Sequence, residues 1–305
     1  MKNPIFVVGS GRSGTTLLQR MMRSHSRISS PTGESHFFIP LYENRALYGD
    51  LTVVENVKKT LEEMRRISRE YVEEDLKGLA FDVDALAEEF TDEGKNNMVA
   101  LISWLMEKNA TGEGKRRWLE KTPYYILHME TILEMFPDAQ FIHIIRDGRD
   151  CALSMLQRKH DLKIFNTYHA AQVWKQYVEA GQQTGKQLQA KQYFELRYED
   201  LIDDPDKTMR RICEFIDEKF EPSMVQFEKS KDPKSKTPML SKSIQKKNSE
   251  KWRDRMSNWS IRVFESEAGQ TLKENGYPLT TSCNTLPAPV LAVYKIHERY
   301  NRNLR

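Results

Sequence analysis

The stretch VVGSGRSGTT at positions 7–16 combines residue types that bind anions. Glycines stand at 9, 11 and 14, a strand-forming run precedes them, and apolar residues recur at helical spacing after them. A strand, a Gly-rich turn and a helix N-terminus direct backbone N–H groups and the positive end of a helix dipole at one point. The stretch therefore predicts an anion site, whose residues are Gly11, Arg12, Ser13, Gly14, Thr15 and Thr16.

The loop differs from a nucleoside triphosphate site in its charged residues. Gly9 and Gly14 have the spacing of a Walker A loop, but Thr15 stands where its lysine belongs and Arg12 carries the fixed positive charge. A triphosphate site also needs a magnesium ligand, commonly an Asp at the end of a neighbouring strand. The best strand of that kind, 141–145, is followed by Arg146, which repels Mg²⁺ and attracts a second phosphate. A P-loop kinase or nucleotide hydrolase stays open as the alternative, as does a glycine turn that merely joins strand to helix.

The elements that position these residues alternate along the chain. Apolar runs predict strands at 5–8, 118–121, 139–145 and 193–197, with helices between them, including 124–136 and 169–189. This order predicts an α/β fold of the P-loop type, with three layers, α/β/α, around a central parallel sheet. Ligands of such sheets bind beyond the carboxyl ends of the strands, which is where the candidate residues fall.

We interpret residues 1–305 as a single domain with three additions. A helical insertion spans 42–113, with helices expected at 51–76, 83–90 and 97–108. A basic loop at 229–253 holds nine Lys and Arg against two carboxylates and is expected to be mobile, either as a solvated loop or as one that closes over a polyanion. A C-terminal helix at 289–305 docks on the body or on a second subunit, so a homodimer stays open.

Composition excludes several classes of protein. The net charge of +3 is too small for a general nucleic-acid binder. Cys151, Cys213 and Cys283 lack metal-ligand spacing, and the first two are expected to be small buried thiols. No apolar run approaches the roughly 20 residues of a membrane span, and the chain leads directly into a strand. We expect a cytoplasmic protein without a signal peptide, a transmembrane segment or a metal requirement.

Three motifs, in order, resemble those of the sulfotransferases that use 3′-phosphoadenosine 5′-phosphosulfate (PAPS), over residues 4 to about 276. GRSGTT at 11–16 resembles the 5′-phosphosulfate loop, with Arg12 as in the tyrosylprotein and bacterial branches. RDGRDCALS at 146–154 is similar to the 3′-phosphate motif, in which Arg146 is followed eight residues later by Ser154. LRYEDL at 196–201 resembles the segment whose tyrosine, here Tyr198, lies near the adenine. The resemblance is closest to the bacterial, tyrosylprotein and carbohydrate branches.

Physical chemistry supports Arg146 as a phosphate holder. An arginine makes charge-assisted, often bidentate bonds to phosphate, and the hydroxyl of Ser154 can join the same oxygens. The structural alternative is a salt bridge from Arg146 to Asp147 or Asp150.

The late motif departs from the family pattern. SIQKKNSEKWR at 243–253 lacks the family's Arg-Lys-Gly segment and is closer to its Ser-x-x-Trp form. The segment offers five polar residues near Trp252 and does not indicate which lysine reaches the 3′-phosphate: Ser243, Lys246, Lys247, Ser249 and Lys251.

The catalytic candidates come from the same resemblance. Glu34, in TGESHFF, matches the glutamate that acts as general base in the carbohydrate, tyrosylprotein and many bacterial enzymes, with a capping or salt-bridged carboxylate as the structural alternative. The histidine of the cytosolic branch is absent because Pro123 stands in its place, so His36 is the second candidate, although packing beside two phenylalanines would explain it equally. Lys121 is expected to stabilise the bridging oxygen together with Arg12, or else to bind Glu120 or Asp150.

The resemblance implies a PAPS-dependent sulfotransferase. Its acceptor would be a hydroxyl of an unidentified carbohydrate, lipid, phenol or small metabolite, and PAP would be the product. A protein that binds PAP without catalysis is a further alternative, disfavoured by the presence of Glu34 and Lys121.

Overall fold

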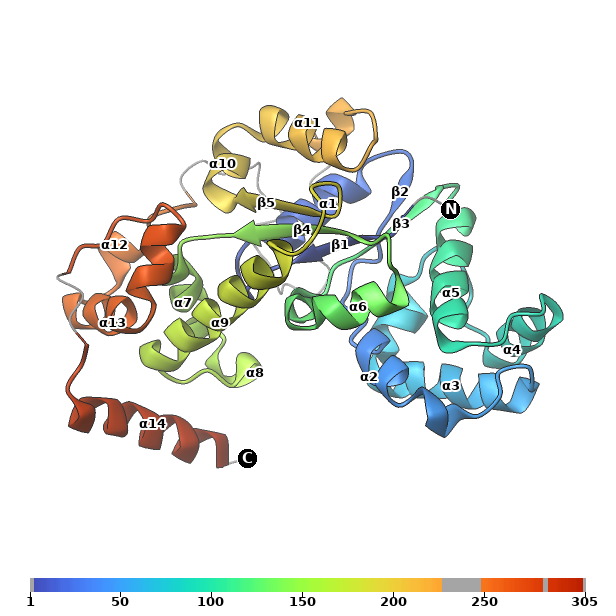
Figure 1. The fold of residues 1–305 in the computed structure, drawn as a ribbon, viewed down its shortest axis with the longest axis horizontal. Helices are drawn as coiled ribbons and strands as arrows, with labels where there is room; N and C mark the ends of the chain where they lie inside the picture. The colour runs from blue at the N-terminus through green and yellow to red at the C-terminus, as the bar shows by residue number, and fades with distance from the viewer. Residues whose placement is uncertain (1–2, 227–247, 282–284, 304–305) are drawn as a thin grey trace.

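A five-stranded parallel sheet lies at the centre of the structure, a computed structural model that describes residues 3–226, 248–281 and 285–303 (Figure 1). The strands lie in the order β2-β3-β1-β4-β5 across the sheet. They are β1 (Ile5–Val8), β2 (Ile28–Ser29), β3 (Arg117–Glu120), β4 (Gln140–Ile145) and β5 (Tyr193–Arg197). Because β1 pairs with both β3 and β4, the Gly-rich loop leaves the middle of the sheet.

The side chains of β1 alternate between two cores. Ile5 and Val7 belong to the cluster on one face of the sheet, and Phe6 and Val8 belong to the cluster on the other. A strand buried on both faces reads as a continuous apolar run, as this one does. Three helices cover the first face, namely α1 (Thr15–Arg23), α10 (Tyr198–Asp203) and α11 (Pro205–Phe215) (Figure 1).

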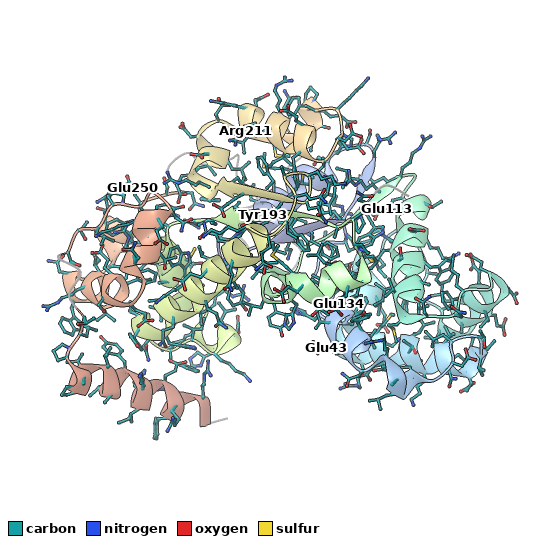
Figure 2. The ribbon with its side chains drawn as sticks, viewed as in Figure 1. Glu43, Glu113, Glu134, Tyr193, Arg211 and Glu250 are labelled. Atoms are coloured by element: carbon teal, nitrogen blue, oxygen red, sulfur yellow. The ribbon has the colours of Figure 1, made fainter. Side chains whose placement is uncertain are left out.

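The second face is covered by helices that follow β3 and β4. They are α6 (Met129–Met135), α7 (Gly148–Gln157) and α9 (Thr167–Gly185), while the short α8 (Lys159–Leu162) contacts α7 and has no buried residue. In Figure 2 Tyr193 of β5 lies on this side, and its ring leaves no room for a Cβ at Gly185 of α9. The three layers confirm the α/β/α prediction.

The insertion between β2 and β3 is helical. It contains α2 (Phe38–Glu43), η1 (Arg45–Tyr48), α3 (Val54–Ile67), η2 (Tyr71–Asp75), α4 (Val83–Asp92) and α5 (Met98–Gly112). Helix α5 lies against β2 and β3 and so covers one edge of the sheet. The prediction of one helix over 51–76 was wrong, because Ser68 leaves the helical region (φ −143, ψ 67) and a single π-helical turn follows.

A second correction concerns the helix predicted at 124–136. The chain forms a 3₁₀ helix, η3 (Pro123–His128), before α6, since His128 adopts φ −128 and ψ 25. Proline at the first position suits a helix start because its missing N–H has no partner there anyway.

The remaining elements are η4 (Pro222–Met224), α12 (Trp252–Arg255), α13 (Asn258–Glu274) and α14 (Ala288–Asn303). Among them, η4 packs on α1, whereas the three helices that follow it pack around α7 and α9. Helix α14 docks on the body, where Glu298 binds His169 of α9 at 2.7 Å. Most of the basic loop predicted at 229–253 lies outside the described residues. Among the residues that are described, no helix has the length and apolarity to cross a membrane.

Candidate active site

The Gly-rich loop has two positions that only glycine can fill. A Cβ on Gly9 would lie 2.6 Å from the carbonyl oxygen of Ile144, and one on Gly14 would lie 2.4 Å from the ring of Tyr198. Both glycines have positive φ, 153° and 106°. Gly14 is also the N-cap of α1. Because glycine has no side chain that can accept a hydrogen bond, no capping side chain satisfies the first N–H groups of that helix. A helix N-terminus of this kind attracts an anion.

Arg12 and Ser154 bring the first two motifs together. Arg12 adopts a left-handed backbone (φ 72) and its Nε donates to Ser154 Oγ at 2.9 Å. Burial lowers the pKa of Arg12, as do the guanidiniums of Arg158 and Arg146, whereas Glu34 raises it. The positive charges of Arg158 and Arg146 near Arg12 form a cluster that a multiply charged anion would stabilise.

Arg146 lies at the end of β4 with its guanidinium against Tyr198. Its Cζ is 4.5 Å from the ring centroid, and Nη2 donates to the carbonyl of Asn248 at 2.6 Å. The same Nη2 reaches Asp150 at 3.4 Å, so the salt-bridge alternative holds in part. Arg146 Nε and Ser13 Oγ are buried and have no hydrogen-bond partner among the described residues. Buried polar groups without a partner, on the loop and on the arginine beside it, fit an anionic ligand.

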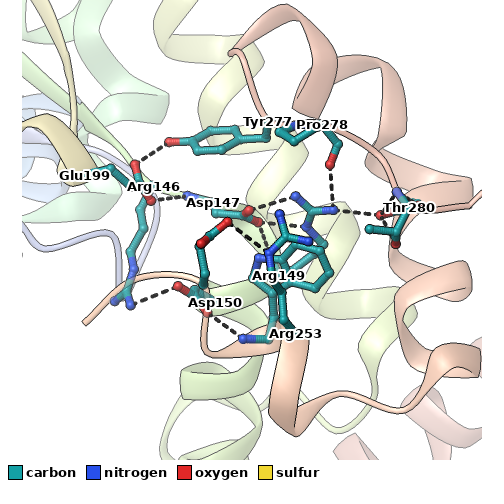
Figure 3. Close-up of polar contacts among 12 residues, drawn as sticks. Arg146, Asp147, Arg149, Asp150, Glu199, Arg253, Tyr277, Pro278 and Thr280 are labelled. Atoms are coloured by element: carbon teal, nitrogen blue, oxygen red, sulfur yellow. Dashed lines mark hydrogen bonds and ion pairs between the residues drawn. The ribbon is translucent and has the colours of Figure 1, made fainter. Parts of the chain in front are cut away.

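Asp147 is not available to Arg146, because it binds a different arginine. Figure 3 shows Arg149 donating to Asp147, while its Nη1 also pairs with Glu265 at 2.7 Å. Arg149 Nη1 donates further to the carbonyl of Pro278 at 3.0 Å. This buried network anchors the start of α7 to α13 and leaves Arg146 as the arginine that faces the loop.

Glu34 and Lys121 form an ion pair at the edge of the site. Lys121 Nζ donates to Glu34 Oε1 at 2.7 Å, and His36 Nε2 lies 3.2 Å from Oε2. Burial raises the pKa of Glu34, but Lys121 and His36 outweigh it and lower the pKa to about 2. The structural alternative for Lys121, a bond to Glu120 or Asp150, is not the one observed, whereas the salt-bridged carboxylate given as the alternative for Glu34 is. His36 is not packed between the phenylalanines either, since 47% of its side chain is exposed.

Tyr177 lies close enough to Tyr124 and Glu34 for their charges to affect it. The Tyr124 ring is 4.6 Å from that of His128. Burial, followed by Tyr124 and Glu34, raises the pKa of Tyr177 to about 12.

The third and fourth motifs meet at Asn248, a residue that the sequence interpretation missed. Its Nδ2 donates to the Tyr198 hydroxyl at 2.6 Å, and Lys251 Nζ donates to its side-chain oxygen. Ser249 follows at a half-buried position. Lys246 and Lys247 lie outside the described residues. The only sequence signal for Asn248 was its place inside the late motif, between a lysine and a serine.

The part of the chain that the structure describes offers this site no cluster of metal ligands, and its two cysteines are buried. Within residues 3–226, 248–281 and 285–303, no cluster of His, Cys, Asp or Glu could hold a metal ion. Cys151 and Cys213 are free and buried as expected, and Cys283 is not among the described residues.

Comparison with known proteins shows the class to which this fold and loop belong. The sulfotransferase family model matches residues 4–222, so the chain belongs to the sulfotransferase family, as its motifs predicted. The sulfotransferase domain from the curacin biosynthetic pathway has a TM-score of 0.63 at 24% identity, covering 92% of this chain and 99% of that chain. The corresponding domain of the Synechococcus PCC 7002 olefin synthase has a TM-score of 0.59 at 22% identity, covering 88% and 96%. These two structures confirm the fold.

The relatives found by sequence are longer than the part that this chain matches. Protein-tyrosine sulfotransferase A of Caenorhabditis elegans is 28% identical over 70% of this chain and 49% of its own. Omega-hydroxy-beta-dihydromenaquinone-9 sulfotransferase Stf3 of Mycobacterium tuberculosis is 28% identical over 70% of this chain and 62% of its own. An uncharacterised protein of Aquifex aeolicus is 27% identical over 83% of this chain and 30% of its own. The chain thus spans less than two thirds of the length of these relatives.

Proposed function

We propose that this protein transfers the sulfuryl group of PAPS to a hydroxyl group of an acceptor. The observation that carries the proposal is the bond between Arg12 and Ser154, which brings the Gly-rich loop and the Arg146 motif to one place. A donor with a phosphosulfate and a separate 3′-phosphate fits two arginine holders. A triphosphate would need a lysine in the loop and a metal ligand after β4, where Arg146 stands.

The cofactor residues take separate parts in this proposal. The loop amides and Arg12 would hold the phosphosulfate, Arg146 and Ser154 the 3′-phosphate, and Tyr198 the adenine. The buried, unsatisfied donors of Ser13 and Arg146 fit these roles. Residues of the late motif would complete the 3′-phosphate site. Any of four residues could do so, namely Lys246, Lys247, Ser249 and Lys251.

Bound PAPS would supply a sulfuryl group on a phosphate leaving group. Glu34 takes the proton of the acceptor hydroxyl as its oxygen forms the new S–O bond. Lys121 and Arg12 stabilise the negative charge on the bridging oxygen as the old S–O bond breaks. Glu34 is ionised at neutral pH, as a general base must be, but its pKa of about 2 makes it a weaker base than a free glutamate for as long as Lys121 and His36 hold it.

The acceptor is proposed only as a hydroxyl compound. By their names, one relative acts on a protein tyrosine and another on a hydroxylated menaquinone. The two acceptors are different kinds of molecule that share a hydroxyl group. A carbohydrate, lipid, phenol or small metabolite stays within the proposal.

Two measurements test the proposal. Isothermal titration calorimetry should show binding of PAP, and no binding would refute a PAPS-dependent activity. Incubation with labelled PAPS and cell-extract fractions should give a labelled product, whose mass identifies the acceptor. The kinase or nucleotide hydrolase alternative predicts instead that ATP binds in the presence of Mg²⁺ and that EDTA abolishes this binding.

A further inference from the structure

Glu120 is a buried carboxylate that the proposed chemistry does not use. It is 1% exposed, and no ion pair to it is found among the described residues. Its Oε2 accepts from the Tyr71 hydroxyl at 2.6 Å. Its Oε1 accepts from Thr122 Oγ1 at 2.5 Å and from Ser35 Oγ at 3.0 Å. A buried charge without a cation persists only where hydrogen bonds satisfy it, as they do here.

The hydrogen bonds around Glu120 can be arranged so that each hydroxyl donates toward the carboxylate. The backbone N–H of Phe38 donates to the Tyr125 hydroxyl at 3.1 Å, and that hydroxyl lies 2.7 Å from Ser35 Oγ. If Tyr125 donates to Ser35, the Ser35 hydroxyl is free to donate to Glu120. An ionised carboxylate only accepts, so this chain of donors ends at Glu120. Burial raises the pKa of Glu120, and the bonds from Thr122, Tyr71 and Ser35 act against that rise.

The backbone of Ser35 is held by the same two side chains. Its N–H donates to Thr122 Oγ1 at 3.1 Å and to Glu120 Oε1 at 3.3 Å. Between Glu120 and Thr122 lies Lys121, which binds Glu34 at 2.7 Å. Residues 120 and 122 therefore hold residue 35, while residue 121 holds residue 34. The two short segments are fixed to each other by three consecutive residues.

We propose that Glu120 is a positioning residue that fixes the Glu34 carboxylate against Lys121. The functional meaning of this role rests on the proposed function, in which Glu34 is the general base. Tyr71 belongs to η2, so Glu120 also ties the helical insertion to the segment that carries Glu34.

The test follows the ionisation of Glu34 and needs no acceptor. The full chain is labelled with ¹³C-glutamate, the Glu34 carboxyl signal is assigned with the Glu34→Gln variant, and the signal is titrated with pH. In the wild type the pKa of Glu34 is expected at about 2. In Glu120→Gln the side chain loses its charge and one of its two acceptor oxygens, so the hydroxyls of Tyr71, Thr122 and Ser35 can no longer all donate to it. Glu34 then loses its fixed contact with Lys121, and its pKa is expected to rise toward the ordinary 4.5.

Tyr71→Phe is the matched comparison. It removes the hydrogen bond to Oε2 and leaves every bond between Glu120, Thr122 and Ser35 in place. It is expected to lower the melting temperature without moving the pKa of Glu34. A folded Glu120→Gln variant whose Glu34 titrates as in the wild type would overturn the proposal, because Glu120 would then be only a structural residue.

Thr122→Val covers the case in which Glu120→Gln does not fold. It cuts the link from Glu120 through Thr122 to the Ser35 N–H, and the same rise in the Glu34 pKa is expected; an unchanged pKa would again contradict the proposal. Absence of PAP binding in the wild type would refute the proposed function and leave this titration result standing.

Discussion

Arg12 Nε donates to Ser154 Oγ at 2.9 Å across 142 residues of sequence. This bond joins the loop after β1 to the helix after β4, two neighbouring strands of the sheet. Parallel strands bring the residues that follow them to one edge, which is the reason that two separate motifs form one site. Arg146, which follows β4 directly, is the third member of that site.

Arg146→Ala should weaken PAP binding by about 10- to 100-fold, since a hydrogen bond to a charged group contributes about 1.5–3 kcal/mol. Adenosine 5′-phosphate, which lacks the 3′-phosphate, should bind the variant about as well as it binds the wild type. Calorimetry with both ligands measures the difference. Arg66→Ala removes an exposed arginine of the helical insertion that pairs with Glu63 and serves as the control. Equal losses for both ligands would contradict a specific role at the 3′-phosphate.

Glu34→Gln should leave PAP affinity nearly unchanged and lower turnover by about 10²- to 10⁴-fold, the range for loss of a general base. The amide keeps the shape of the side chain but cannot take a proton. Rates are measured with the acceptor found by labelling, next to calorimetry with PAP. Normal turnover in this variant would show that Glu34 is not the base.

Stability should depend on pH through Glu34. Its folded pKa is about 2 against an ordinary 4.5, so its contribution is complete above pH 4.5 and is lost as the pH falls toward 2. Because 36% of the side chain is exposed, we expect only about 1 kcal/mol at pH 7. Urea unfolding should show Glu34→Gln less stable by that amount at pH 7 and equal to the wild type near pH 2. Glu43→Gln, at an exposed position, should show no such trend.

Gly14→Ala should destabilise the protein by about 1–3 kcal/mol, because the residue has φ 106 and a Cβ would meet the Tyr198 ring at 2.4 Å. Gly11→Ala is the matched comparison in the same loop, since a Cβ there meets nothing within 4 Å. Thermal unfolding of both variants checks the difference. A Gly14→Ala protein as stable as Gly11→Ala would contradict the close packing of Tyr198 on the loop.

The elements that were predicted correctly are those with a strong local pattern. The apolar run of β4 and the glycine spacing after β1 specify a strand and a turn regardless of distant residues. The breaks at Ser68 and His128 were missed because both segments keep apolar residues at helical spacing. Where a helix ends depends on backbone angles that the packing of neighbouring elements selects.

By itself the sequence determined the class of the fold, the Gly-rich anion loop and the types of residue available to bind phosphate. These depend on the order of short patterns and on the chemistry of single side chains. Only the tertiary structure decided which of them meet: Lys121 with Glu34 rather than Glu120 or Asp150, and Asn248 with Tyr198. A hydrogen bond requires its atoms to lie within about 3 Å, and for residues far apart in the chain only the packing of the sheet and its helices provides that.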